Sequence, residues 1–305
     1  MLSLVRRLTG LVPVLVAATL VVFLFLRLLP GDPARLIAGS EASAADVAAL
    51  RADMGLDRPI WQQYGSFLMR AVQGDFGLSL RTRRPVVEEV RARLSSSLLL
   101  ATAAAGWAVV AGVALGAWTV AHRGGRIDLA GRLVAVAGVA MPSFWLGLLL
   151  IDVFAVRLGW LPTGGGGSFS HLVLPAIALG TAMAATLARV TRAAMIEVLG
   201  EDFVRTARAK GLGEPIVLWR HVLRVALAPV VTLAGVQFGS LLGGAVVVET
   251  VFAWPGLGRL LAESVAMRDY PVIQAILLVY VLCFALVNLC VDLAYGMIDP
   301  KVRTS

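Results

Sequence analysis

Six long apolar runs constrain the fold of this chain more than any other feature. A helix rises 1.5 Å per residue, so about 20 apolar residues cross the roughly 30 Å hydrocarbon core of a bilayer. Of the 305 residues, 59% are hydrophobic and 15% are charged, whereas soluble domains carry about 25% charged residues. We therefore predict an all-α polytopic membrane protein with six transmembrane helices. The predicted spans are residues 8–29, 94–121, 133–156, 171–191, 225–248 and 272–295.

The polar residues between the apolar runs divide the chain into four predicted parts. The first run follows Arg6 and Arg7, and no small-residue cleavage site follows it, which indicates a retained anchor rather than a signal peptide. Ser43 and Pro59 are typical first residues of short helices in the polar segment that comes next. The predicted parts are residues 1–30 (N-terminus and first span), 31–93 (a helical extracytoplasmic segment), 94–298 (the transmembrane core) and 299–305 (a tail).

The distribution of positive charge predicts the topology. The net charge is +8, and the arginines lie between apolar runs instead of gathering on one soluble face, which favours membrane topology over nucleic-acid binding. If the N-terminus is inside, the short outer loops hold only Arg157, Arg259 and Arg268. We therefore expect a multi-pass membrane protein with both termini in the cytoplasm. Residues 201–224 then form a cytoplasmic loop.

This loop, residues 201–224, carries both signs of charge between two apolar runs. Residues up to Lys210 read as a short helix in which Phe203, Ala207 and Lys210 share one face, and Gly211 is a typical residue for ending a helix. Two interpretations are open at this point. The loop docks a soluble partner, or its positive charge only sets the topology.

No sequence motif predicts catalysis. The chain lacks a GxxxxGK[ST] phosphate loop, a GxSxG elbow and an HExxH helix, so we expect no enzyme activity and no nucleotide site on this chain. Its histidines, His122, His171 and His221, fall at span ends. The cysteines, Cys283 and Cys290, form no CxxC or Cys/His pattern, so we predict no metal site and no cofactor.

Small and polar residues inside the runs suggest packing and lining roles. Glycines at four-residue spacing let helices approach closely, which predicts packing positions at Gly112, Gly116, Gly235, Gly239 and Gly243. Polar groups at membrane depth need a partner or a polar cavity. They either line a solute path or pair with one another, for example Arg27 with Glu249. The candidates are Arg27, Asp152, Gln237, Glu249, Asn288 and Asp292.

The ordered motifs of the chain resemble one family from end to end. They are LPGDP at 29–33, GLDRP at 55–59, GDFG at 74–77, MPSFW at 141–145, DFVRTARAKGL at 202–212, RHVLR at 220–224, ETVF at 249–252, WPGLG at 254–258, RDYP at 268–271 and DP at 299–300. The chain resembles the B-type permease subunit of ATP-binding cassette (ABC) importers of the dipeptide, oligopeptide and nickel class.

The resemblance implies a type I ABC importer permease fold and a set of partners. These partners are a homologous second permease that completes a heterodimer, two ATPase subunits or domains that bind ATP and Mg²⁺, an extracytoplasmic substrate-binding protein, and a peptide substrate. It also implies that the cytoplasmic loop couples to the ATPase. Carried over by position, the implied coupling residues are Arg205, Thr206, Ala207 and Gly211. The ring of Phe203 and the positive charges of Arg208 and Lys210 suit the same contact on physical grounds, so we include them among the predicted coupling residues. Arg205 stands where the general motif has glutamate.

Two alternatives to peptide import are open from the sequence. The same machine imports nickel or another small solute, because the substrate-binding protein largely sets the choice. A stand-alone secondary carrier is the other alternative. It would need ionisable groups near the membrane midplane, and this sequence has few of them.

Overall fold

The computed structural model describes residues 13–24, 33–38, 42–53 and 55–298. Within these ranges every regular element is a helix, and a single isolated bridge joins Leu78 and Pro85. The chain divides into two compact units, residues 1–95 with 260–285 and residues 96–259 with 286–305. Arg27 lies outside the described residues, and so do both ends of the predicted first span, of which Pro13–Leu24 is a described helix.

The first unit contains the predicted extracytoplasmic helices. Its elements are Pro13–Leu24, α2 (Pro33–Ala38), α3 (Ala44–Asp53), α4 (Ile60–Val72), the start of α5 (Val86–Ala121), most of α12 (Leu257–Ala266) and the first part of α13 (Tyr270–Ile298).

Local sequence signals explain where α3 and α4 begin and end. The Ser43 hydroxyl donates to Asp46 at 2.7 Å and accepts from the Asp46 backbone N–H at 3.2 Å, which closes the first turn of α3. Gly55 and Gly74 follow the two helices with φ of +65° and +74°, a conformation that glycine adopts without strain. The helices expected in segment 31–93 are therefore present at the predicted places.

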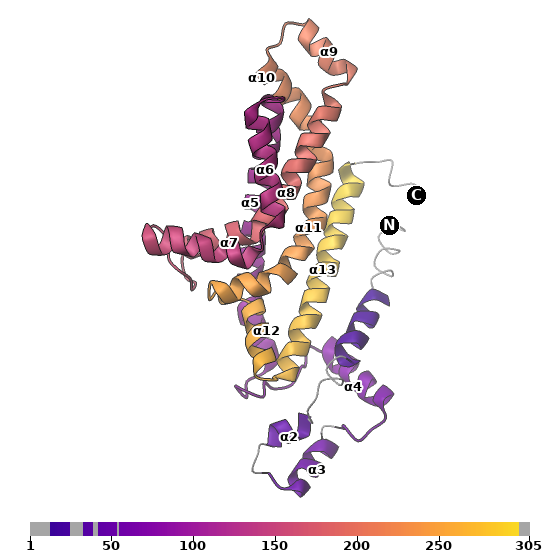
Figure 1. Cartoon of the computed structure of the whole chain (residues 1–305). Helices are drawn as coiled ribbons and strands as arrows, with labels where there is room; N and C mark the ends of the chain where they lie inside the picture. Colours follow the sequence, from indigo (N-terminus) through magenta and orange to yellow (C-terminus); the bar gives the residue numbers. More distant parts are fainter. Residues whose placement is uncertain (1–12, 25–32, 39–41, 54, 299–305) are drawn as a thin grey trace. The chain divides into compact units, whose positions relative to one another are not determined.

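The second unit holds most of the remaining helices (Figure 1). They are the rest of α5, α6 (Arg126–Ala140), α7 (Ser143–Leu150), η1 (Ile151–Arg157), α8 (Phe169–Val198), α9 (Asp202–Ala209), α10 (Glu214–Ile216), η2 (Val217–Val222), α11 (Leu223–Val251) and the end of α13. Helix α8 is the central one, because 67% of its apolar window is buried against 28% for α5 and for α11.

The described residues contain four helices that are long and apolar enough to cross a membrane, or five if one bent pair is a single span. The bent pair is α6 with α7–η1, which meet at 109° beside Met141 and Pro142. Proline pushes the preceding residue out of the helical region, and Met141 is extended with ψ of 121°. These helices are therefore long and apolar enough for several crossings, and the predicted 133–156 span is broken at Met141 and Pro142.

The loop before α6 is shorter than predicted. We expected residues 122–132 to be loop, but α6 begins at Arg126. Gly124 turns the chain with φ of +82°. Asp128 then lies in the first turn of α6, where a carboxylate interacts favourably with the helix dipole.

Two of the predicted glycine positions bring α5 against α8. A Cβ on Gly112 would lie 2.6 Å from the Ala184 carbonyl oxygen, and one on Gly116 would lie 2.6 Å from that of Ala188. Any side chain at these positions would therefore force the two backbones apart.

The glycines of α11 differ from one another. A Cβ on Gly235 would lie 2.6 Å from a methyl group of Val291, whereas one on Gly243 would meet no atom within 4 Å in the described part of the chain. Gly239 is buried.

Candidate functional site

Helix α9 forms within the predicted loop, between Glu201 and Lys210. Its last turn closes with backbone bonds from Lys210 to Thr206 at 3.1 Å, from Gly211 to Arg208 at 2.9 Å and from Leu212 to Ala207 at 3.3 Å. Gly211 ends the helix with φ of +82°, so the predicted glycine stop is observed. The next helical stretch begins at Glu214 and continues without a break to Val251.

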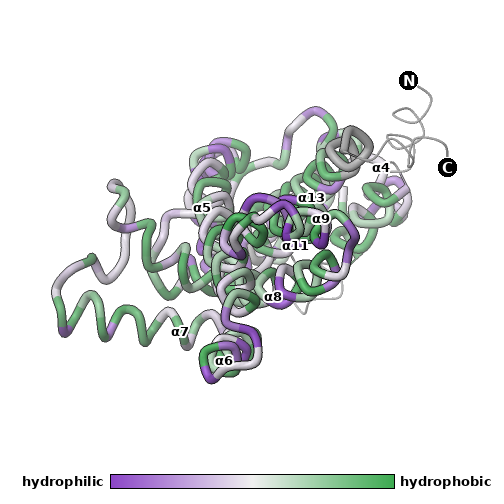
Figure 2. The backbone as a smooth tube through the Cα atoms, turned by 90° about the horizontal axis from the view of Figure 1, so that it is seen from above, coloured by the Kyte–Doolittle hydropathy of each residue, from purple (hydrophilic) through white to green (hydrophobic). Residues whose placement is uncertain are grey.

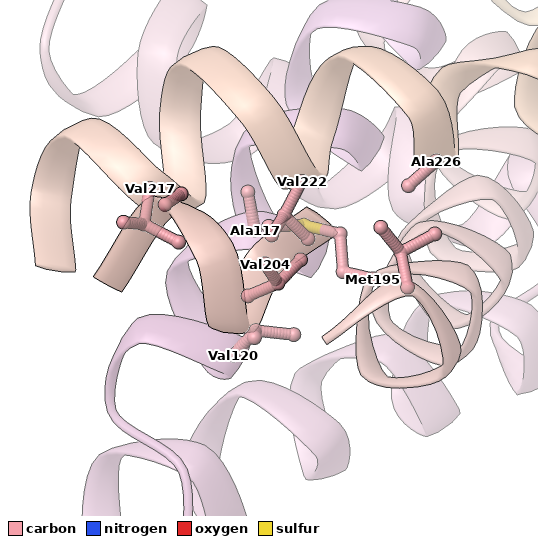
Figure 3. Packing of buried hydrophobic residues seen from close by; sticks show 9 residues of the cluster. Ala117, Val120, Met195, Val204, Val217, Val222 and Ala226 are labelled. Carbon is pink, nitrogen blue, oxygen red and sulfur yellow. The ribbon is translucent and has the colours of Figure 1, made fainter. Parts of the chain in front are cut away.

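The inner face of α9 packs into an apolar cluster. Val204 is fully buried and Ala207 is 6% exposed. Their neighbours in the cluster come from the ends of α5, α8 and the Glu214–Val251 stretch (Figure 3). These neighbours are Ala117, Val120, Met195, Val198, Val217, Val222 and Ala226. Helix α9 therefore rests on three long helices at once.

This packing corrects one part of the sequence expectation. Ala207 is one of the predicted coupling residues, but its side chain faces the chain's own core. The structure places Phe203, 40% exposed, on the outer surface instead. Val204, which the sequence did not single out, is the buried anchor. Its spacing of three residues from Ala207 is the only sequence signal that could have identified it.

The outer face of α9 is polar, because Asp202, Arg205, Thr206 and Arg208 are exposed. Purple stretches of the tube near the α9 label in Figure 2 mark hydrophilic residues. The Arg208 guanidinium donates two hydrogen bonds to the Glu214 carboxylate at 2.6 and 3.2 Å, and this partner raises the pKa of Arg208. Arg205 lies 3.4 Å from Asp202, and the Thr206 hydroxyl donates to the Asp202 carbonyl at 3.0 Å. Lys210 is exposed. The outer face therefore presents an aromatic ring and three basic side chains.

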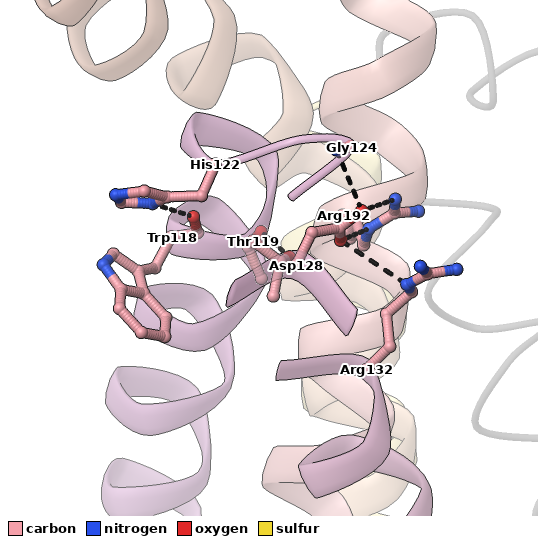
Figure 4. A network of polar contacts seen from close by, with 8 residues as sticks. Trp118, Thr119, His122, Gly124, Asp128, Arg132 and Arg192 are labelled. Carbon is pink, nitrogen blue, oxygen red and sulfur yellow. Dashed lines mark hydrogen bonds and ion pairs between the residues drawn. The ribbon is translucent and has the colours of Figure 1, made fainter. Parts of the chain in front are cut away.

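A second polar site joins α6 to α8 (Figure 4). Arg192 donates to both carboxylate oxygens of Asp128 at 3.1 Å, and Arg132 lies 3.5 Å from the same carboxylate. Asp128 is buried, and the backbone of Gly124 also donates to it at 3.4 Å. A bidentate pair of this kind fixes geometry as well as charge. Asp128, the one acid in the arginine-rich stretch 122–132, was not among the predicted site residues.

A third polar site surrounds Glu249, which is fully buried. Its Oε1 accepts from the Ser97 hydroxyl at 2.6 Å, and its Oε2 accepts from the backbone N–H groups of Gly258 and Arg259 at 2.7 and 3.1 Å. Ser97 also accepts from the Leu257 N–H at 2.7 Å. Gly256 lies against the carboxyl group, where no side chain would fit. These contacts tie α5 and α11 to the turn that starts α12.

Of the other predicted polar residues, the structure describes the side chains of Asp152, Gln237 and Asn288. Asp152 pairs with Arg157 at 2.8 Å on the exposed surface of η1. Gln237 lines a cavity, and Asn288 is half-buried on α13. Neither Arg27 nor the side chain of Asp292 is among the described groups, so the suggested Arg27–Glu249 pairing stays a prediction.

Two family models match the chain. The model of the binding-protein-dependent transport system inner membrane component matches residues 108–304, and the model of its N-terminal part matches residues 1–101. The chain belongs to this family. Members of this family are the non-catalytic membrane permeases of ABC transporters, so this chain is a non-catalytic subunit.

Individual relatives agree with this assignment. The chain is 52% identical over 299 residues to the glutathione transport system permease protein GsiC of Escherichia coli K12, covering 98% of both chains. It is 51% identical to the protein of the same name from Shigella flexneri over the same coverage. The chain is thus a B-type permease of the dipeptide, oligopeptide and nickel class.

Solved structures show the same fold at low sequence identity. An inward-facing MetNI methionine ABC transporter structure matches with a TM-score of 0.59 at 18% identity, over 69% of this chain and 96% of that chain. An amino acid ABC transporter matches with a TM-score of 0.54 at 18% identity, over 69% and 94%. The helical core described above is therefore an ABC importer permease fold.

Proposed function

We propose that this chain is the peptide-conducting permease subunit of an ATP-driven importer in the bacterial inner membrane. It pairs with a homologous second permease, receives small peptides from an extracytoplasmic binding protein, and is powered by ATPase subunits that bind ATP and Mg²⁺. Both termini and α9 face the cytoplasm in this proposal, consistent with the positive charge of the loops that would lie there. Segment 31–93 faces outside, where it is in reach of the binding protein.

The substrate class is supported by the relatives. The GsiC proteins are named for glutathione transport, and glutathione is a tripeptide. We expect di- and tripeptides, glutathione among them, to be the solutes carried. Identification of the ligand that co-purifies with the binding protein tests this class, and a bound nickel complex would support the nickel alternative instead. Membership of a binding-protein-dependent family leaves the stand-alone carrier without support.

The observation that carries the coupling proposal is the two-sided packing of α9. Its outer face offers Phe203, Arg205, Arg208 and Lys210 to an ATPase surface, where aromatic and arginine side chains are typical anchors. Its inner face packs on α5, α8 and η2. A movement of the ATPase would therefore reach three membrane helices through one short helix.

Substitution of Gly211 tests the coupling. Asp at φ of +82° is strained, so Gly211→Asp should displace the end of α9. We expect the complex to assemble while peptide uptake and peptide-stimulated ATPase activity fall about tenfold or more, as for other losses of positioning. Both are measured in proteoliposomes that contain all subunits.

The matched control is Gly213→Asp. It adds the same charge to the same loop, but Gly213 has φ of −67°, which any residue adopts. Equal uptake by both variants and the unmodified complex would contradict the coupling proposal. Equal loss in both would assign the effect to the added charge rather than to the helix end.

A further inference from the structure

A pocket of about 210 Å³ lies between the last turns of α5, the first half of α6 and the second half of α8. Three arginines line it, Arg132 on α6 and Arg189 and Arg192 on α8, together with apolar side chains, glycines and one threonine. All lining residues belong to the second unit. None of the residues assigned to coupling lines this pocket, so the function proposed above does not explain its three basic groups.

The three guanidinium groups can reach a molecule in the pocket. The Arg132 and Arg192 side chains are 51% and 24% exposed, and Arg189 is exposed. Arg192 uses its Nε and Nη2 atoms for the bidentate pair with Asp128 (Figure 4), so its Nη1 donors stay available. Arg189 has no ion-pair or hydrogen-bond partner for its side chain within the described residues.

The pocket carries a surplus of positive charge. In the described part of the chain, Asp128 is the single carboxylate within ion-pair distance of any of these arginines, and it does not line the pocket. Three positive charges against one negative charge leave two uncompensated. Like charges repel one another, and guanidinium groups bind phosphate oxygens through paired N–H donors. An anion with phosphate chemistry therefore fits the pocket.

The pocket lies at the depth of phospholipid headgroups. Its α5 residues are Leu115, Gly116 and Thr119. They precede the end of α5 at Ala121, where the apolar run also ends, by about 3–9 Å along the helix axis. The headgroup region on each side of a bilayer is about 5–8 Å thick. Arginine side chains near the end of a span extend to this level.

An exposed apolar surface adjoins the arginines. Val136 lines the pocket and is 57% exposed. Leu133 and Val139, which lie one turn to either side of it on α6, are 60% and 44% exposed. A free anion gains nothing from such a surface, whereas acyl chains gain free energy by contact with it and not with water. The combination of basic groups and apolar face matches an amphiphile.

We propose that Arg132, Arg189 and Arg192 bind the phosphate group of an anionic phospholipid. The phosphate oxygens accept hydrogen bonds from the arginines, and the acyl chains lie along the exposed face of α6. Asp128 holds Arg192 in position for this contact through the bidentate pair. The site goes beyond peptide conduction and does not depend on the transported solute. If α9 faces the cytoplasm, as proposed above, the lipid comes from the inner leaflet.

Binding of phosphatidylglycerol by Arg189→Gln tests the site. The substitution removes one charge and breaks no contact in the described part of the chain, so the fold should be kept. We expect the affinity for phosphatidylglycerol to fall about fivefold, because one basic side chain near an anionic lipid contributes roughly that factor. Arg132→Gln together with Arg189→Gln should weaken binding about 30-fold. Native mass spectrometry of the complete, delipidated complex during titration with the lipid measures both.

Arg123→Gln together with Arg126→Gln is the matched control. Both arginines are exposed beside the start of α6, and neither lines the pocket. The control removes the same charge from the same end of the helices, so it should bind phosphatidylglycerol within twofold of the unmodified complex. Lipid sites elsewhere on the complex are common to all variants, so the comparison isolates this pocket.

Inorganic phosphate and phosphatidylcholine separate the possible sources of the phosphate. Inorganic phosphate lacks acyl chains and should not displace phosphatidylglycerol at equal concentration. Phosphatidylcholine carries a compensating positive charge and should bind several-fold more weakly. Displacement by inorganic phosphate would make the pocket a site for a free anion and overturn the lipid contact.

Two further results would overturn the site itself. One is phosphatidylglycerol binding by the Arg132 and Arg189 double variant within twofold of the control. The other is an equal loss in both double variants, which would assign binding to general charge. Either result leaves peptide import standing, because uptake is measured separately in proteoliposomes.

Discussion

The attachment of α9 and the surroundings of Glu249 both involve α5 and the Glu214–Val251 stretch, but they hold their helices by opposite means. Helix α9 rests on α5, α8 and η2 through methyl groups and one methionine. In the described part of the chain, hydrogen bonds from α9 side chains reach no further than Glu214. The Glu249 carboxyl group instead joins α5, α11 and the start of α12 through three directional hydrogen bonds.

The difference indicates which end of the second unit is built to move. Apolar packing has no directional requirement, so α9 can tilt while its buried face stays covered. Hydrogen bonds weaken steeply when their angle changes, so the Glu249 contacts resist the same tilt. In the proposed transport cycle, α9 therefore transmits motion, and the Glu249 site keeps two helix ends and a turn in a fixed arrangement.

Glu249→Gln should have the largest effect on stability. Glutamine has one carboxamide oxygen for two groups of donors, so either Ser97 or the Gly258 and Arg259 N–H groups would face an NH₂ group. We expect a loss of about 3 kcal/mol in the free energy of unfolding, because buried donors are left without acceptors. Thermal unfolding of the purified complex in detergent measures it.

Glu197→Gln is the control for this change. Glu197 lies exposed on α8, where loss of a charge should shift the unfolding midpoint little. Equal midpoints for the two variants would show that the Glu249 contacts do not hold the helices together.

Val204→Ala should have a smaller and more local effect. It removes two methyl groups from a fully buried position, which costs about 2 kcal/mol at roughly 0.8 kcal/mol or more for each group. Val204 attaches only the short helix α9 to the rest of the cluster, so we expect a local effect. Hydrogen exchange of the α9 amides should accelerate by up to about 30-fold, as that free energy implies. Amides of α8 should be unaffected.

Val225→Ala provides the comparison, since Val225 is 50% exposed on α11. It should leave the exchange of α9 unchanged. If the α9 amides of Val204→Ala exchange at the same rate as those of the unmodified chain, α9 is held by something other than its buried face. The contrast with the Glu249 site would then be lost.

Glu214→Gln should have the smallest effect. It removes the ion pair with Arg208. The Arg208 and Glu214 side chains are 44% and 57% exposed, and such exposed pairs contribute little to stability. The shift in unfolding midpoint should be small and should vanish in about 1 M salt, where charges are screened within about 3 Å. A shift as large as that of Glu249→Gln, persisting in high salt, would make the outer face of α9 part of the folded core.

Some of the site could be predicted from sequence because it depends on neighbours along the chain. Gly211 ends α9 through its own backbone conformation, and Ser43 begins α3 through a contact three residues away. Asp128 was missed because its partner Arg192 is 64 residues away. Likewise, the sequence does not show whether the side-chain amide of a polar residue such as Gln237 has a hydrogen-bond partner.

The sequence by itself determined the helical, membrane-spanning class, the family motifs and the place of the loop that becomes α9. These follow from apolar run length and local backbone preferences, which act over a few residues. Only the tertiary structure decided that Val204 rather than Phe203 is the buried anchor of α9, and that α6 and α7 turn by 109°. It also surrounded Glu249 with donors from α5 and α12. Burial and hydrogen-bond pairing depend on which segments meet in space, and spacing along one chain does not specify that.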